Sequence, residues 1–194
     1  MKNSKKHIAD YEFSIGLRLT HWIRAISIVV LSVSGFYLAY VFVSPAITGE
    51  PINFMNAKWR AVHQIAGFIL IGCFIFKTYL FLGKHPHIQG TYNPLQFASY
   101  IFFYIVLFVI CLTGLILYVN VYHDGLGGLL YTPMRAIEAW MGGLANVRQI
   151  HHIAMWIIFI FVVVHIYMAV FNAIKGKDGA MDAIISGYKF PKEK

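Results

Sequence analysis

Five of the nine histidines lie in or at the edge of long apolar stretches. Three of them, His151, His152 and His165, belong to one stretch, QIHHIAMWIIFIFVVVHIYMAVF, which covers residues 149–171. A helix of about 20 residues crosses the roughly 30 Å hydrocarbon core of a bilayer. An ionisable side chain at that depth needs a partner, a cavity or a metal, because hydrocarbon cannot solvate it. His151 and His165 are therefore candidate metal ligands.

The spacing of these two histidines places them on one face of a helix. Fourteen positions separate them, so their side chains lie within roughly 40° of each other and about 21 Å apart along the axis. We therefore predict that His151 and His165 each bind the iron of a different haem. His152 lies roughly 140° from His165 around the helix. For His152 the favoured interpretation is an interfacial side chain, hydrogen-bonded to a loop or to lipid headgroups.

The composition is that of a membrane protein. Hydrophobic residues make up 59% of the 194-residue chain and charged residues 12%, and the mean hydropathy is +0.65. Only helices fit, because nothing shows the alternation of a transmembrane barrel. We predict one all-α domain over residues 1–194, a four-helix transmembrane bundle that binds two b-type haems. Its expected spans are residues 19–43, 59–82, 95–119 and 149–171.

The net charge of +8 predicts topology better than it predicts nucleic-acid binding. Twelve of the sixteen Lys and Arg residues fall on the side that would hold both termini and the loop between the second and third spans. The positive-inside rule then places both termini, with the tail of residues 175–194, in the cytoplasm. The first span is too long for the core of a cleavable signal peptide, so we expect it to remain as an anchor.

The two cysteines limit how a cofactor can be held. Cys73 and Cys111 lie inside expected spans and form no C-x-x-C-H attachment motif. They are also too few to bind an iron–sulfur cluster. Any haem must be b-type, without thioether links, and any cluster must belong to a partner.

The positions of the histidines along their spans predict two ligand pairs. His63 lies just inside the external end of the second span, at the depth expected for His151. His21 and His165 both lie towards the cytoplasmic end. We therefore predict an outer haem held by His63 and His151 and an inner haem held by His21 and His165.

Three cations and one glycine are further candidates for contact with these cofactors. Arg18 and Arg24 lie three residues to either side of His21, and guanidinium groups bind carboxylates such as haem propionates well. The alternative is that they only obey the positive-inside rule. Lys77 is placed to meet a propionate or a quinone, or else to extend to the inner interface. Gly35 would let a macrocycle approach the backbone, or would serve helix packing.

The third span and the loop before it contain no predicted ligand. The span has no histidine, lysine or arginine, and we expect it to pack against the others, with Thr113 and Gly114 as positions of close approach. His85 and His87 lie in the loop of residues 83–94. No Cys, Asp or Glu is nearby, so we expect them to be solvent-exposed.

The second external loop, residues 120–148, is the longest. Pro133 is expected to start a short amphipathic helix that directs Ile137, Trp140 and Met141 to the membrane. Such a helix could dock a peripheral partner or lie at the interface without one.

With these motifs in place, the chain resembles the b-type cytochrome subunit of membrane-bound nickel–iron hydrogenases. The resemblance runs from about Tyr11 to Phe190. The chain is also similar in plan to the cytochrome b subunit of formate dehydrogenase and, more loosely, to b561-type cytochromes. The segments that carry it are R-L-T-H-W at His21, A-V-H-Q-I-A-G at His63, I-H-H-I-A-M-W at His151, V-H-I-Y-M-A at His165, T-P-M-R-A-I-E, and the tail I-I-S-G-Y-K.

The resemblance implies an electron-transfer subunit in a bacterial inner membrane, with no hydrogen chemistry of its own. Electrons would come from the iron–sulfur clusters of a hydrogenase small subunit, which connects it to the large subunit, and pass through two haems to menaquinone or ubiquinone. The complex could be an oligomer. The alternatives are a cytochrome that serves another dehydrogenase, a b561-type quinone-linked cytochrome, and a structural anchor without redox chemistry.

Overall fold

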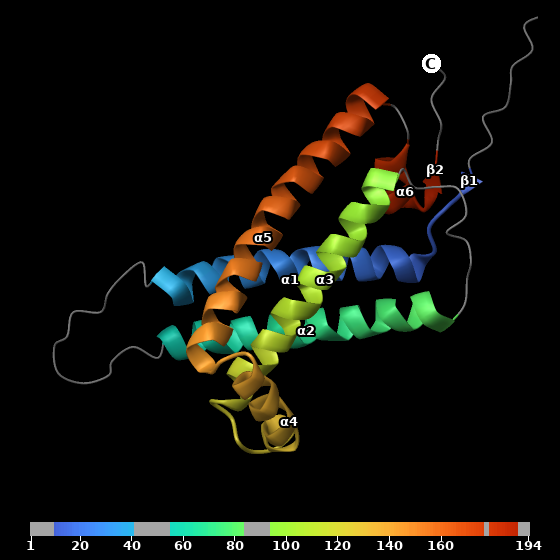
Figure 1. The fold of residues 1–194 in the computed structure, drawn as a ribbon. Helices are drawn as coiled ribbons and strands as arrows, with labels where there is room; N and C mark the ends of the chain where they lie inside the picture. The colour runs from blue at the N-terminus through green and yellow to red at the C-terminus, as the bar shows by residue number, and fades with distance from the viewer. Residues whose placement is uncertain (1–9, 41–54, 84–93, 177–178, 190–194) are drawn as a thin grey trace, which may run out of the picture. The chain divides into compact units, whose positions relative to one another are not determined.

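The computed structural model describes residues 10–40, 55–83, 94–176 and 179–189. Each of its four long helices contains a stretch that is long and apolar enough to cross a membrane. The predicted all-α membrane fold with four spanning helices is therefore confirmed (Figure 1). The long helices are α1 (Ile15–Tyr40), α2 (Met55–Gly83), α3 (Pro94–Val119) and α5 (Leu144–Phe171).

The shorter elements lie between α3 and α5 and towards the chain ends. The chain divides into two compact units, one of Met1–Ile23 with Ile160–Lys194 and one of Arg24–Phe159. The expected single domain stays a prediction. The shorter elements are α4 (Leu126–Trp140), the π-helix η1 (Asn172–Gly176), α6 (Ala180–Ser186), and the strands β1 (Asp10–Tyr11) and β2 (Tyr188–Lys189).

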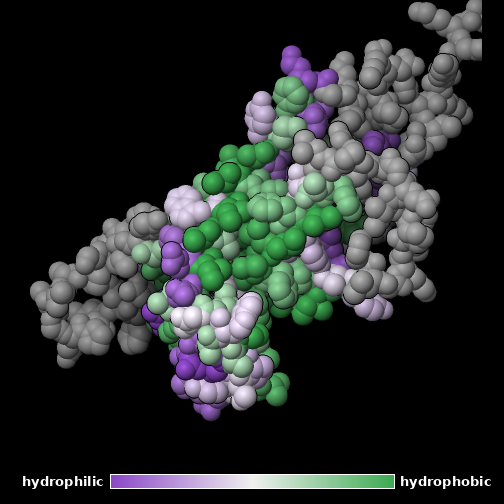
Figure 2. Space-filling model, in the orientation of Figure 1, coloured by the Kyte–Doolittle hydropathy of each residue, from purple (hydrophilic) through white to green (hydrophobic). Residues whose placement is uncertain are grey.

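Apolar side chains cover the outer surfaces of the long helices. On α3, Leu107 and Ile116 are fully buried, but Ile105 and Phe108 are more than half exposed. Figure 2 shows hydrophobic residues over much of the visible surface of the long helices, whereas hydrophilic residues gather around α4. Soluble proteins rarely expose apolar surface on this scale. The helices are therefore suited to lipid contact.

All four spanning helices begin earlier than the apolar stretches that predicted them, and α1 and α5 show the cause. α1 starts at Ile15, because the Ser14 hydroxyl accepts a hydrogen bond from the Leu17 backbone amide at 3.4 Å. A serine before a helical run is an N-cap signal, which could have been found in the sequence. α5 starts at Leu144, directly after Gly142 and Gly143, whose φ angles of +86° and +95° end the preceding helix.

The expected start of α4 was wrong. Pro133 lies inside this helix, which begins at Leu126. An interior proline costs about 3 kcal/mol because it removes a backbone hydrogen bond, and tertiary contacts offset this cost. Glu138 is buried and accepts hydrogen bonds from the Asn120 amide and the Arg135 guanidinium, each at 2.6 Å. The bond from Asn120, which directly follows α3, fastens α4 to the end of that helix, and the bond from Arg135 lies within α4.

The residues expected on the membrane-facing side of α4 differ in their exposure. Ile137 and Met141 are half-buried, whereas Trp140 is 87% exposed. Leu129, which was not predicted to face outward, is 77% exposed. Whether this face meets lipid or a docking partner stays a prediction.

The two ends of the described chain are joined to each other. β1 pairs with β2 in an antiparallel register that matches Asp10 with Lys189. The Arg18 guanidinium donates to the Ile185 carbonyl at 2.7 Å, and the Trp22 indole donates to the Ile184 carbonyl at 3.4 Å. The C-terminal tail of residues 175–194 was expected only to lie in the cytoplasm, so this folded segment was missed. Both ends lie together, and which side of the membrane holds them stays a prediction.

Gly187 permits this arrangement, and we predict that Gly187→Ala loosens it. Gly187 has φ +91°, and an added Cβ would lie 3.0 Å from the Phe13 carbonyl oxygen. A left-handed conformation costs an L-residue about 1–2 kcal/mol, which corresponds to a roughly tenfold larger population with the tail detached. Trypsin cleavage after Lys189 in the purified protein should accelerate by that factor, since cleavage follows the population with the tail detached.

The control is Gly16→Ala. An added Cβ there meets nothing within 4 Å, so this variant should leave the cleavage rate unchanged. Equal rates in the two variants would contradict the prediction.

Candidate metal centres

The first pair of histidines joins α2 to α5. The rings of His63 and His151 are neighbours, with their centroids 6.4 Å apart and their planes at 63°. Both side chains are half-buried in the unit of Arg24–Phe159. The structure therefore brings together the two residues expected at the outer haem.

The second pair joins α1 to α5. The centroids of His21 and His165 are also 6.4 Å apart, with the ring planes at 54°. This pair lies in the other unit, where Phe161 stacks on His165 at 6.1 Å and Trp22 meets the edge of His21 at 5.5 Å. The two residues expected at the inner haem are likewise neighbours.

The separation of the rings fits a metal held between two imidazoles. An imidazole nitrogen lies about 2 Å from a metal such as zinc, and about 1 Å from the centre of its own ring. Two opposed ligands of one metal therefore place their ring centroids about 6 Å apart, close to the 6.4 Å seen in both pairs. The residues present thus fit bis-histidine ligation of haem iron, and the ligation itself stays a prediction.

A hydroxyl and a glycine from α1 surround His63. The Ser34 Oγ lies 2.8 Å from the imidazole Nδ1. A Cβ added at Gly35 would lie 3.4 Å from His63 Cε1 and 3.5 Å from the Met155 sulfur. Gly35 was expected to make room for a macrocycle, and here it makes room for the ring of a candidate ligand. Ser34 was missed, because its role depends on which face of α1 meets α2.

The same pair of residue types surrounds His151, now supplied by α3. The Thr113 Oγ1 lies 2.9 Å from the His151 Nδ1. A Cβ added at Gly114 would lie 3.5 Å from His151 Cε1. These two residues were expected to mark a close approach between helices, and they approach a candidate ligand. The third span thus supports a ligand without supplying one.

The other predicted residues lie in different settings. The Arg18 guanidinium donates a hydrogen bond to the Ile185 carbonyl in the C-terminal segment. Arg24 is half-buried and Lys77 is exposed. Neither residue is shown to contact a cofactor, so their roles stay predictions.

The remaining histidines that the sequence singled out do not join either pair. His152 accepts a hydrogen bond at 3.3 Å from the Trp156 indole one turn along α5, and its expected bond to a loop or to lipid headgroups stays a prediction. His85 and His87 lie outside the described residues.

No further metal centre is evident in the part of the chain that the structure describes. No group of three or more His, Cys, Asp or Glu side chains in this part could hold a metal ion. Cys73 and Cys111 are free thiols.

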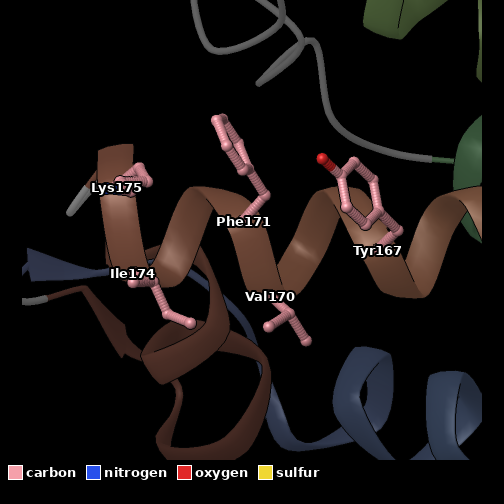
Figure 3. Close-up of a pocket in the computed structure, with 5 residues that line it drawn as sticks. All are labelled: Tyr167, Val170, Phe171, Ile174 and Lys175. Carbon is pink, nitrogen blue, oxygen red and sulfur yellow. The ribbon is translucent and has the colours of Figure 1, made fainter.

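A hollow at the C-terminal end of α5 is lined by a single helical segment. Figure 3 shows Tyr167 and Phe171 on one side of the helix and Val170 and Ile174 on the other. Its volume is about 220 Å³, below the 300–1,000 Å³ usual for small-molecule sites. It does not identify a quinone site.

Comparison with known proteins places these features in a family. The family described as prokaryotic cytochrome b561 matches residues 12–187. This range includes both histidine pairs and the hydroxyl and glycine residues beside His63 and His151. The chain belongs to this family. The expected resemblance to b-type cytochromes is therefore confirmed.

The chain is also similar over nearly its full length to proteins named probable Ni/Fe-hydrogenase B-type cytochrome subunit. One from Cupriavidus necator is 28% identical, with 93% of this chain and 87% of that protein covered. One from Azotobacter vinelandii is 28% identical, with 97% and 92% covered. A third, named probable Ni/Fe-hydrogenase 1 B-type cytochrome subunit, from Escherichia coli K12, is 23% identical, with 97% and 94% covered.

Proposed function

We propose that this protein is the cytochrome b subunit of a nickel–iron hydrogenase. It would carry electrons from the iron–sulfur clusters of the hydrogenase small subunit to quinone in the membrane. The names of the similar proteins support the hydrogenase as the partner. Hydrogen would be oxidised in the large subunit and not in this chain.

The two opposed histidine pairs are the observation that carries the proposal. Each pair has the 6.4 Å ring separation that one iron atom needs. His63 and His151 would hold an outer b-type haem, and His21 and His165 an inner one. Bound haem supplies reversible one-electron transfer, and axial ligation and burial are the means by which a protein sets its potential.

Cations in the spans support a cofactor that carries negative charge. None of the eight acidic residues lies within the four spans, whereas seven Lys and Arg residues do, among them Arg18, Arg24 and Lys77. A charged side chain in a membrane needs a counter-charge or access to the interface. We propose that haem propionates supply this counter-charge at Arg24, and at Arg18 alongside its bond to Ile185. Lys77 would meet a propionate or the quinone.

The orientation follows from the distribution of basic residues. With both termini in the cytoplasm of a bacterial cell, the external ends of α2 and α5 face the periplasm, and His63 and His151 lie on the side of the hydrogenase. Electrons would then move inward across the membrane. Each charge moved against a potential of 100 mV stores about 2.3 kcal/mol.

The test is purification of the intact complex from membranes, followed by spectroscopy and a haem count. We expect two non-covalent b-type haems per chain, reducible by hydrogen when the nickel–iron subunits are present. Purification with a different dehydrogenase would replace the hydrogenase as partner. A spectrum without b-type Soret and alpha bands would overturn the proposal and favour a structural anchor.

A further inference from the structure

The two outer histidines are supported in the same way by different helices. In each case a hydroxyl residue faces the imidazole Nδ1, and the glycine that follows it faces Cε1. Ser34 and Gly35 of α1 do this for His63. Thr113 and Gly114 of α3 do it for His151.

Each hydroxyl also lies against a backbone carbonyl of its own helix. The Ser34 Oγ is 2.7 Å from the Val30 carbonyl oxygen. The Thr113 Oγ1 is 2.8 Å from the Val109 carbonyl oxygen. A hydroxyl has one proton to donate and two lone pairs that accept. A carbonyl oxygen can only accept, so the hydroxyl proton must lie between the two oxygens.

This leaves one consistent set of hydrogen-bond directions. If the hydroxyl donated to Nδ1 instead, it would face the carbonyl oxygen with no proton between them, at under 3 Å. Two acceptors at that distance repel each other. The hydroxyl therefore accepts, and the imidazole Nδ1–H donates.

We propose that Ser34 and Thr113 are positioning residues that hold His63 and His151 in the Nδ1–H tautomer, so that both Nε2 atoms are free to bind one iron. The inference rests on the outer haem proposed above and deepens it. In the neutral ring one nitrogen is a donor and the other an acceptor. A fixed donor at Nδ1 therefore makes Nε2 the metal ligand, and a bond at Nδ1 also sets the rotation of the ring.

The hydrogen bond has an electronic consequence as well. A partner that accepts from the far nitrogen of a ligating imidazole raises the basicity of the nitrogen on the metal. A more basic ligand favours ferric over ferrous iron. Removing either hydroxyl should therefore weaken haem binding at the outer site and raise the midpoint potential of the outer haem.

Substitutions at Thr113 separate the effect of side-chain shape from the effect of the hydrogen bond to His151. Thr113→Val keeps the shape and loses the hydroxyl, whereas Thr113→Ser keeps the hydroxyl and loses a methyl group. Ser34→Ala tests the other ligand. Ser32→Ala is its matched control, since Ser32 lies two positions away on α1 and so about 200° around the helix.

The experiment is a haem titration and a potentiometric titration of the full-length protein and these variants. Thr113→Val and Ser34→Ala should bind haem at the outer site about tenfold or more weakly, since outer-shell partners typically contribute 10- to 100-fold to metal affinity. The ferric-to-ferrous ratio of the outer haem should fall by up to about tenfold, which equals 59 mV for one electron. Thr113→Ser and Ser32→Ala should match the wild type. The inner haem should not change in any variant.

The outcomes separate this inference from the proposed function. A wild-type protein with two haems whose outer affinity and potential are unchanged in both Thr113→Val and Ser34→Ala overturns the inference alone. So does a loss in Thr113→Ser that is equal to the loss in Thr113→Val, because the loss would then not follow the presence of the hydroxyl. A wild-type protein that binds no haem at His63 and His151 overturns both.

Discussion

Replacing His165 by alanine should reduce the haem content from two per chain to one. The variant loses one of two opposed ligands, and the ring of His21, 6.4 Å away in the wild type, would face an empty space. The outer pair of His63 and His151 uses different residues and should keep its haem. In the intact complex that remaining haem should still be reduced by hydrogen. Reduced-minus-oxidised spectra, with a haem count per chain, measure the result.

The control for this prediction lies on the same helix. His152→Ala removes a histidine whose imidazole accepts a hydrogen bond from Trp156 and joins neither pair. It should retain two haems per chain. Two haems in His165→Ala would rule out His165 as a ligand, and one haem in His152→Ala would show that any lost histidine on α5 disturbs the protein.

Replacing Gly35 by a larger residue should remove the outer haem and leave the inner haem in place. An added Cβ would already lie 3.4 Å from His63 Cε1 and 3.5 Å from the Met155 sulfur. A leucine side chain would push further and turn the His63 ring away from His151. Overpacking typically costs 1–3 kcal/mol, so Gly35→Leu should weaken haem binding at the outer site by roughly 5- to 150-fold. Haem titration of the purified protein measures this.

Glycine elsewhere in the spans provides the comparison. Gly72 of α2 is exposed, and a Cβ added there meets nothing within 4 Å. Gly72→Leu should therefore keep both haems with unchanged affinity. If Gly35→Leu binds the outer haem as tightly as Gly72→Leu does, the space beside His63 is not needed by the site.

Much of the architecture could be predicted from the chain because the membrane simplifies the problem. A backbone in hydrocarbon must form helices, so long apolar stretches mark the spans. The helical repeat then predicts that His151 and His165 share a face at two depths, which leaves His152 on another face. The histidines of the other spans could be matched to them by depth alone.

The parts that were missed depend on contacts between distant segments. The pairing of β1 with β2 joins residues at opposite ends of the chain, and short polar segments give little local signal for such a contact. α4 continues through Pro133, and its Glu138 accepts a hydrogen bond from Asn120 beyond the end of α3, which stabilises the helix from outside. A local rule about proline could not include that stabilisation.

The sequence by itself determined the membrane class, the four spans and the candidate ligands, because hydropathy and helical periodicity are local properties. Only the tertiary structure decided which neighbours each ligand has. Ser34 reaches His63, and Thr113 reaches His151, because α1 and α3 are rotated to present those residues to α2 and α5. Rotation of one helix against another is set by packing over many side chains at once. In the sequence, Ser34 and Thr113 are small residues within a span. In the folded chain, their hydroxyls are therefore the partners of candidate iron ligands.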